Sequence, residues 1–176
     1  GVHRRACRCY SRRMTTLAII WYSRTGGSRQ LAEAARDAAQ DAGDVDVRFL
    51  AADDADADDL LSADGYLFAC PENLAAIAGV MKAFFDRTYY EVLGKVEGRP
   101  YAAIICAGSD GENAKKQLER ICQGWRLKRI ADTPIVNVGA QTKEEILADK
   151  EIGEEYLGQA RELGATLAAG LEMGVF

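Results

Sequence analysis

Apolar runs of strand length alternate with longer stretches of helical period along most of this chain. The runs that read as strands cover residues 17–22, 45–50, 65–70, 101–107 and 135–138. The first is almost continuously apolar, as expected for a central parallel strand that is covered on both faces. Helical crossovers between parallel strands are right-handed and place helices on both faces of the sheet. The sequence therefore predicts an α/β fold with three layers, a doubly wound five-stranded parallel sheet between helices.

Two further patterns locate helices. Leu31, Ala34, Ala35 and Ala38 repeat at the spacing of one helix face, which we interpret as core packing. Near the C-terminus, residues 142–145 fit a capping box, with threonine at the N-cap and glutamate at the third helical position. The sequence predicts a long C-terminal helix from this point, with Gly153 as a candidate interruption.

The first 13 residues differ in composition from the rest. They hold five arginines and no acidic residue, and they precede Met14, which reads like a natural start. We interpret residues 1–13 as a disordered leader or cloning remnant and residues 14–176 as one domain. Without those arginines the domain is more acidic than the whole chain, whose formal net charge is −5. Such a charge disfavours nucleic acid and anionic membrane surfaces as partners, and no apolar stretch is long enough to span a membrane.

Histidine and cysteine usage narrows the chemistry. The only histidine is His3, so a histidine base, a Ser-His-Asp triad or a histidine-ligated metal would have to draw on the extreme N-terminus. The five cysteines form no C-x-x-C pair and are odd in number, which supports neither a disulfide framework nor a zinc site. We therefore predict no metal site and a reducing, cytoplasmic location. Cys70, at the end of the third strand, is either packed in the core or close to a ligand.

Ligands of doubly wound sheets bind at the carboxyl ends of the strands, so the loops there carry the functional signal. After the first strand comes Ser23-Arg24-Thr25-Gly26-Gly27-Ser28, which leads directly into a helix. Its glycines let backbone N–H groups converge, the helix N-terminus adds partial positive charge, and its hydroxyls are donors. This arrangement suits a terminal phosphate monoester. The alternative is an ordinary turn in which Ser28 is the N-cap of the helix.

Two more loops lie at the same end of the predicted sheet. The loop after the third strand has an apolar edge and an amide that can pair with a heterocycle: Pro71, Glu72, Asn73 and Leu74. The loop after the fourth strand has two glycines that allow close backbone approach to a flat ligand: Gly108, Ser109, Asp110 and Gly111. In the alternative interpretation, Asp110 only caps the next helix.

These loops together resemble those of the flavodoxin superfamily. The resemblance rests on the Ser-x-Thr-Gly-x-Ser loop, on the Pro-Glu-Asn loop with Met81-Lys82-x-Phe84-x-Asp86-Arg87 downstream, and on the glycine loop after the fourth strand. It spans residues 14–175 and is strongest to the short NAD(P)H-dependent FMN reductase branch. It implies a flavodoxin-like strand order of 2-1-3-4-5 and FMN as cofactor.

The resemblance also implies where FMN sits and what it does. It places the phosphate on Ser23, Thr25, Gly26, Gly27 and Ser28, and the isoalloxazine ring between residues 71–74 and 108–111. The implied activity is hydride transfer from NADPH or NADH, through FMN, to a small acceptor such as a quinone or a free flavin. The flavin then carries the chemistry, so no catalytic side chain is expected. Members of this branch often form homodimers.

The positions of aromatic residues bear on whether the chain is a reductase or an electron carrier. Neither ring loop contains Trp, Tyr or Phe, so one face of the flavin is open to a nicotinamide unless Tyr89, Tyr90 or Trp125 covers it. The alternative is an electron-carrier flavodoxin that docks to redox partner proteins without turnover of its own. The aspartates within residues 53–59 mildly favour such docking. A third possibility, a module that has lost FMN, conflicts with the complete set of hydroxyls in the first loop.

Overall fold

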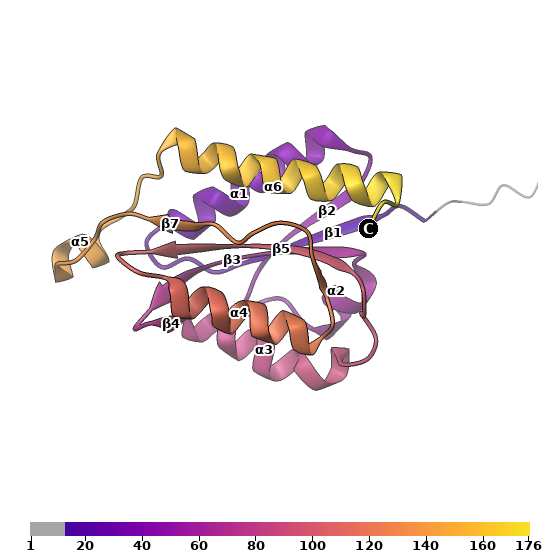
Figure 1. The fold of residues 1–176 in the computed structure, drawn as a ribbon, viewed down its shortest axis with the longest axis horizontal. Coiled ribbons are helices and arrows are strands. Elements are labelled where there is room, and N and C mark those ends of the chain that lie inside the picture. The colour runs from indigo at the N-terminus through magenta and orange to yellow at the C-terminus, as the bar shows by residue number, and fades with distance from the viewer. Residues whose placement is uncertain (1–12) are drawn as a thin grey trace, which may run out of the picture.

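A computed structural model describes residues 13–176, which form a parallel sheet between two layers of helices (Figure 1). The central strands lie in the order β2 (Asp46–Ala51), β1 (Thr16–Trp21), β3 (Gly65–Asn73) and β5 (Pro100–Ala107) and pair in parallel. The next position is divided between β6 (Lys128–Arg129) and β7 (Ile135–Asn137), which pair with the two ends of β5. The predicted fold class and strand order are confirmed.

The third strand is longer than its sequence predicts. It continues through Pro71, which pairs with Cys106 of β5, and ends at Asn73. The chain then folds back as the antiparallel strand β4 (Ala76–Ile77). Proline lacks an N–H donor, but here its carbonyl oxygen accepts from Ala78 at 3.0 Å, so the hairpin closes around it. The prediction that this strand ends at Pro71 was wrong.

Two hydrophobic cores fill the space between the layers. Helices α1 (Gly27–Ala42) and α6 (Glu154–Met173) cover one face of the sheet, and α2 (Ala57–Ser62), α3 (Gly79–Val92) and α4 (Glu112–Gly124) cover the other (Figure 1). Side chains of β1 alternate between them: Leu17 and Ile19 face α1 and α6, and Ala18 and Ile20 face the other layer. None of the described helices is long and apolar enough to cross a membrane.

Helices α1 and α6 approach each other closely through small side chains. A Cβ atom at Gly164 of α6 would lie 2.7 Å from the carbonyl carbon of Ala35 in α1 and 2.8 Å from its Cα. Ala32, Ala35 and Ala39 of α1 and Ala160 of α6 are fully buried in the same core. The two helices therefore meet almost backbone to backbone.

The predicted long C-terminal helix is divided in two. The capping box is confirmed, because Thr142 accepts from the N–H of Glu145 and the Glu145 carboxylate accepts from the N–H of Thr142. The helix that it starts, α5 (Lys143–Leu147), ends after five residues. The backbone is extended at Ala148, and α6 begins only after its N-cap Gly153. Gly153 thus marks the start of α6 rather than an interruption within a longer helix.

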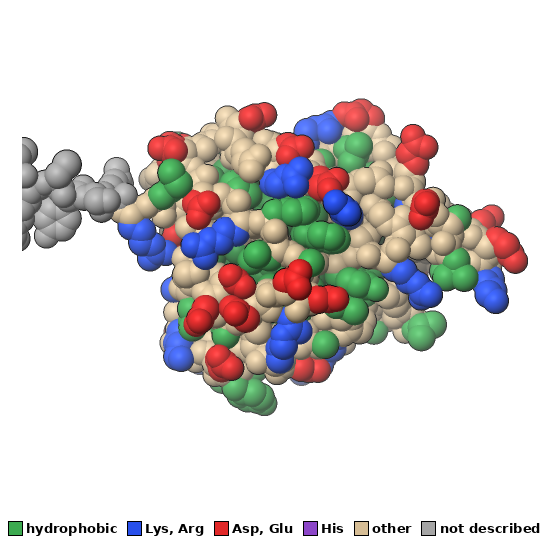
Figure 2. All heavy atoms as spheres, turned by 180° about the vertical axis from the view of Figure 1, so that it is seen from behind, with side chains coloured by type: hydrophobic (Ala, Val, Ile, Leu, Met, Phe, Trp, Pro, Cys, Tyr) green, Lys and Arg blue, Asp and Glu red, His purple; other side chains and the backbone are tan. Residues whose placement is uncertain are grey.

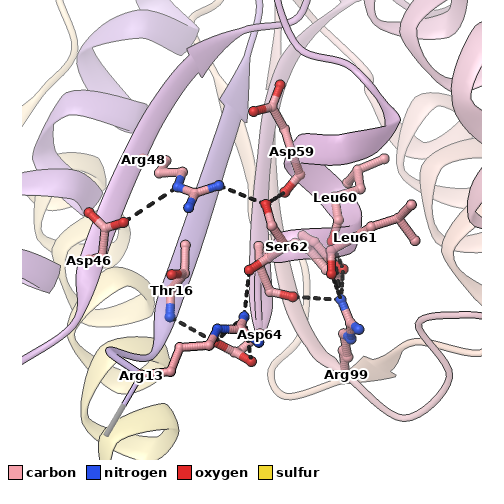
Figure 3. A network of polar contacts seen from close by, with 12 residues as sticks. Arg13, Thr16, Asp46, Arg48, Asp59, Leu60, Leu61, Ser62, Asp64 and Arg99 are labelled. Atoms are coloured by element: carbon pink, nitrogen blue, oxygen red, sulfur yellow. Dashed lines mark hydrogen bonds and ion pairs between the residues drawn. The ribbon is translucent and has the colours of Figure 1, made fainter. Parts of the chain in front are cut away.

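Arginine side chains gather around the C-terminal end of α2 (Figure 3). Arg99 donates to the carbonyl oxygens of Leu61 at 2.9 Å and Ala63 at 2.7 Å, and Arg48 donates to the Ser62 hydroxyl at 2.7 Å. Carbonyl groups at the end of a helix lack partners within it, and cations are favoured there. Arg13 joins the network by donating to the Ser62 carbonyl oxygen at 2.7 Å. Residues 1–12 of the predicted leader lie outside the described residues.

Candidate functional site

The three predicted loops meet around a small cavity at the carboxyl ends of β1, β3 and β5. Its volume is about 80 Å³, and the residues that line it come from all three loops and from the segment after β7: Arg24, Thr25, Pro71, Glu72, Asn73, Cys106, Ala107, Gly108, Val138, Ala140, Ile146 and Lys150. Five of the predicted site residues, Thr25, Pro71, Glu72, Asn73 and Gly108, thus lie together. Leu74, Ser109 and Asp110 are exposed and do not line the cavity. The other predicted site residues do not line it either: Ser23, Gly26, Gly27, Ser28 and Gly111.

The loop after β1 leads into a helix whose N-terminus has no side-chain cap. Gly26 is the N-cap of α1 in the left-handed conformation, with φ of 92°, and no side chain caps the helix. The Gly26 N–H donates to the Ser23 Oγ at 3.0 Å, which closes the loop on itself. Ser28 lies within the first helical turn, so the alternative in which it is the N-cap is wrong.

Ser28 is the residue whose environment points most clearly to a ligand. It is only 2% exposed, and its Oγ has no hydrogen-bond partner among residues 13–176. A buried hydroxyl without a partner costs about 1–3 kcal/mol, so such groups call for an explanation. The first N–H groups of a helix also lack partners within it and attract anions. An anion at the N-terminus of α1 would satisfy both requirements. The cavity reaches this loop at Arg24 and Thr25 and not at Ser28 itself, so the fit of a phosphate group rests on the loop and on the helix N-terminus behind it.

The hairpin after β3 has a strained turn. Asn73 pairs with Ala76, and the two residues between them have positive φ, 51° at Leu74 and 64° at Ala75. This is the pattern of a type I′ turn, which Asn-Gly adopts readily and branched or Cβ-bearing residues adopt at a cost. Leu74 is fully exposed at its tip. The chain thus retains a strained apolar tip next to the cavity, as functional sites often do.

Replacing Leu74-Ala75 by Asn-Gly is expected to raise the free energy of unfolding by roughly 1–2 kcal/mol, because each left-handed residue with a Cβ costs about that much and the gain is partly offset by glycine entropy. Urea unfolding followed by circular dichroism measures the change. Leu74→Ala alone keeps a Cβ at positive φ and serves as the control, with no comparable gain. Equal stability of the Asn-Gly variant and the parent would contradict the strain.

The hairpin and the glycine loop are fastened to each other. The Glu72 carboxylate accepts from the N–H of Gly111, and the Asn113 side-chain amide donates to the Ala75 carbonyl oxygen at 2.5 Å. Packing leaves no space for a side chain at either glycine of this loop. A Cβ at Gly108 would lie 2.7 Å from the Ala140 carbonyl oxygen, and one at Gly111 would lie 2.7 Å from Ile135. Gly111, not Asp110, is the N-cap of α4.

Cys106, rather than Cys70, is the cavity cysteine. Cys106 lines the cavity, and a Cβ at Gly27 would lie 2.9 Å from its Sγ. Burial raises the pKa of Cys106 to about 11, against the opposing charge of Lys150, and burial raises the pKa of Cys70 to about 12. Both are therefore neutral thiols at pH 7. Cys70 is fully buried in the core on the α3 and α4 side, as its packing interpretation predicts.

The aromatic residues that could have covered a ring lie elsewhere. Trp125 is fully buried and stacks on Tyr89 with ring centroids 5.6 Å apart, and its indole N–H donates to the Tyr89 carbonyl oxygen at 3.0 Å. These residues belong to the C-terminal ends of α3 and α4, which return to the opposite end of the sheet. Tyr90 is exposed at that same end of α3. The residues that line the cavity include no aromatic side chain.

The segment after β7 supplies cavity residues that sequence reasoning missed. Val138, Ala140, Ile146 and Lys150 line the cavity, although the sequence suggests only the start of a helix there. No sequence motif in this stretch indicates a binding role. Arg24, in the loop after β1, also lines the cavity.

Comparison with known proteins places the chain in a family. The family described as "NADPH-dependent FMN reductase" matches residues 54–141, half of the chain. The chain belongs to this family. The match covers the hairpin and the glycine loop, and the resemblance to the flavodoxin superfamily and its FMN reductase branch is confirmed.

A curated relative of this chain is named as a flavodoxin. A protein of Aquifex aeolicus (strain VF5) named "Flavodoxin" is 30% identical to this FMN reductase family member over 98 residues. That match covers 56% of the chain and 53% of the relative, so the chain spans about half the length of the curated relative that it matches.

Solved structures share the fold at low sequence identity. A flavodoxin from the domain Archaea superposes with a TM-score of 0.73 at 18% identity, over 89% of this chain and 99% of that one. A flavodoxin, WrbA-like protein from Agrobacterium tumefaciens gives 0.68 at 16% identity, over 90% and 98% of the two chains. The flavodiiron core of Flv1 from Synechocystis sp. PCC6803 gives 0.71 at 18% identity, over 91% of this chain and 36% of that chain. The family member is therefore flavodoxin-like in fold.

Proposed function

We propose that this chain is an FMN-dependent oxidoreductase that takes hydride from NADPH or NADH and delivers electrons to a small acceptor such as a quinone or a free flavin. The observation that carries the proposal is the buried Ser28 hydroxyl, which has no hydrogen-bond partner in the described part of the chain and lies at the N-terminus of α1, where no side chain caps the helix. Membership of an FMN reductase family supports FMN as the ligand of this site.

The residues present fit the phosphate end of FMN. The hydroxyls of Ser23, Thr25 and Ser28 would donate to the phosphate, together with the N–H groups of Gly27 and Ser28 at the start of α1. The Gly26 N–H already donates to Ser23, so Gly26 serves the loop through its left-handed conformation. The hydroxyl bonds are charge-assisted, and the helix N-terminus favours the anion.

The two fastened loops would hold the ring. Residues 71–74 and 108–111 lie at the carboxyl ends of the adjacent strands β3 and β5, and the bond between the Glu72 carboxylate and the Gly111 N–H joins them. Bound FMN would supply two-electron chemistry, with hydride accepted from a nicotinamide and electrons released to an acceptor. Because no aromatic side chain lines the cavity, none of the lining residues would stack on the ring in the place of a nicotinamide. The neutral Cys106 thiol holds its proton at pH 7 and adds no charge to the site.

The second candidate is an electron carrier of the flavodoxin type, as the name of the Aquifex aeolicus relative suggests. The aspartates around α2 would be its docking surface. Asp56 and Asp59, however, form the capping box of α2, which gives them a structural purpose. The face in Figure 2 also carries acidic and basic side chains next to one another, rather than acidic ones alone. These observations favour the reductase.

Thr25→Ala is expected to weaken FMN binding by tenfold or more, because a charge-assisted hydrogen bond contributes about 1.5–3 kcal/mol. Titration of the apo-protein with FMN, followed by quenching of flavin fluorescence, measures the change. Thr25→Ser keeps the hydroxyl and should bind as the parent does. Equal affinity of Thr25→Ala and the parent would remove the proposed phosphate site.

Anaerobic stopped-flow mixing of the FMN-loaded protein with NADPH or NADH separates the two candidates. Direct bleaching of the flavin absorbance supports the reductase, and absence of bleaching supports the carrier. The coenzyme that bleaches faster is the preferred donor. We also propose a cytoplasmic location, supported by the three buried free cysteines among residues 13–176, and a homodimer, which sedimentation velocity would detect.

A further inference from the structure

Residues 141–153, which we call the strap, lie across the loop that leads into α1. The Lys150 N–H donates to the Thr25 carbonyl oxygen at 2.8 Å. Ile152 is 5% exposed, and a Cβ at Gly27 would lie 3.4 Å from its Cδ1. Figure 1 shows α5, the helical part of the strap, beyond the end of the sheet at which β5 and β7 stop. The strap therefore forms one wall of the cavity and covers the proposed phosphate site from outside.

One side chain connects the strap to the loop. The Nε2 of Gln30, in the first turn of α1, donates to the carbonyl oxygens of Gly26 at 3.0 Å and Lys150 at 2.6 Å. Its Oε1 accepts from the Ile152 N–H at 3.1 Å. A primary amide has two donors and an acceptor at one end, so only Asn or Gln can make this set of bonds, and only Gln is long enough at this position.

The outer part of the strap is stabilised by hydrogen bonds within the strap rather than by packing against the hydrophobic core. The Lys150 ammonium donates to the carbonyl oxygens of Glu145 at 2.7 Å, Ile146 at 3.1 Å and Ala148 at 2.5 Å, which folds the end of α5 around it. No residue of α5 is buried, and Ile146 and Leu147 are about half exposed. Segments with few buried apolar contacts open at low free energy, so the strap can move as one unit.

We propose that the strap is a gate over the phosphate end of the cofactor site and that Gln30 is the positioning residue that latches it. The proposal rests on FMN binding at this site. The cavity of about 80 Å³ is well below the roughly 300–1,000 Å³ of small-molecule sites, so the wall that the strap forms has to move outward for the phosphate end of a flavin nucleotide to fit. Opening must break the bonds of Gln30 to Lys150 and Ile152, together with the bond from the Lys150 N–H to Thr25 and the packing of Ile152.

The latch is tested first without cofactor. Gln30→Met keeps the length of the side chain and removes its three bonds. Hydrogen exchange of the apo-protein is expected to quicken tenfold or more at the Lys150 and Ile152 amides, with no change in β1. Gln40→Met, an exposed substitution on the same helix, is the matched control and should leave all these amides as in the parent. Unchanged exchange in Gln30→Met overturns the latch.

The gate is tested by the kinetics of FMN binding. Opening from a closed state limits both entry and exit, so Gln30→Met should raise the association and dissociation rate constants together, each by tenfold or more, with a dissociation constant within threefold of the parent. A residue that only shapes the site would change dissociation alone, and that result overturns the gate. If the parent binds no FMN, the proposed function fails and the gate with it, whereas FMN binding with unaltered association overturns the gate only.

Discussion

Gly164→Ala is expected to lower the free energy of unfolding by about 3 kcal/mol, the upper part of the range for overpacked cores. The added methyl group would lie 2.7 Å from the carbonyl carbon of Ala35, and this neighbour is the backbone of α1, not a side chain that can turn away. Helices α1 and α6 must therefore separate. In a chain of this size the loss corresponds to a fall in melting temperature of about 6–12 °C, which calorimetry or thermal circular dichroism measures.

The same helix provides the control. A Cβ at Gly158, also within α6, meets only the end of the Arg161 side chain at 3.9 Å. Gly158→Ala should therefore stabilise the protein by about 0.5–1 kcal/mol, through helix propensity alone. One substitution, made twice on one helix, is thus expected to act in opposite directions. A Gly164→Ala variant as stable as Gly158→Ala would contradict the close approach of the two helices.

Ser28→Asp is expected to weaken FMN binding at least a hundredfold, about 2.8 kcal/mol. The new carboxylate would occupy the N-terminus of α1, where it satisfies the same N–H groups that the phosphate requires. Two unit charges 4 Å apart repel by roughly 4 kcal/mol at the effective dielectric of a protein surface, and a phosphate monoester carries nearly two. Fluorescence titration of the apo-variant with FMN measures the effect.

Two controls separate charge from bulk in that experiment. Ser28→Asn has the size of the aspartate without its charge, so it should weaken FMN binding much less. Riboflavin lacks the phosphate, so its affinity should be the same in Ser28→Asp and Ser28→Asn. If the two variants bound FMN equally, the phosphate would not lie against Ser28.

The fold was predictable because its signals are local. The apolar run at β1 and the regular spacing of alanines in α1 report burial through a few neighbouring residues, whatever the rest of the chain does. The Thr142 capping box was predictable for the same reason, since its partners are three residues apart. The hydroxyl loop after β1 was found through its position at the end of a strand.

The strap could not be predicted, because its contacts are distant in sequence. Gln30 and Lys150 are 120 residues apart, and nothing in the sequence near either residue indicates the other. Which of Cys70 and Cys106 lines the cavity was also not predictable, because it depends on the pairing register of β3 and β5. Pro71 pairs with Cys106, so Cys70 points to the opposite face of the sheet, and one residue of register decides which thiol lines the cavity.

The division of the last sheet position between β6 and β7 affects whether a strand from another molecule can pair with this edge of the sheet. These segments span two and three residues, so that border of the sheet offers no long row of free backbone groups to a strand from another molecule. At the other border, β2 carries Asp46 and Arg48, and charges there discourage intermolecular strand addition. Both borders of the sheet thus carry features that oppose the addition of a strand from another molecule.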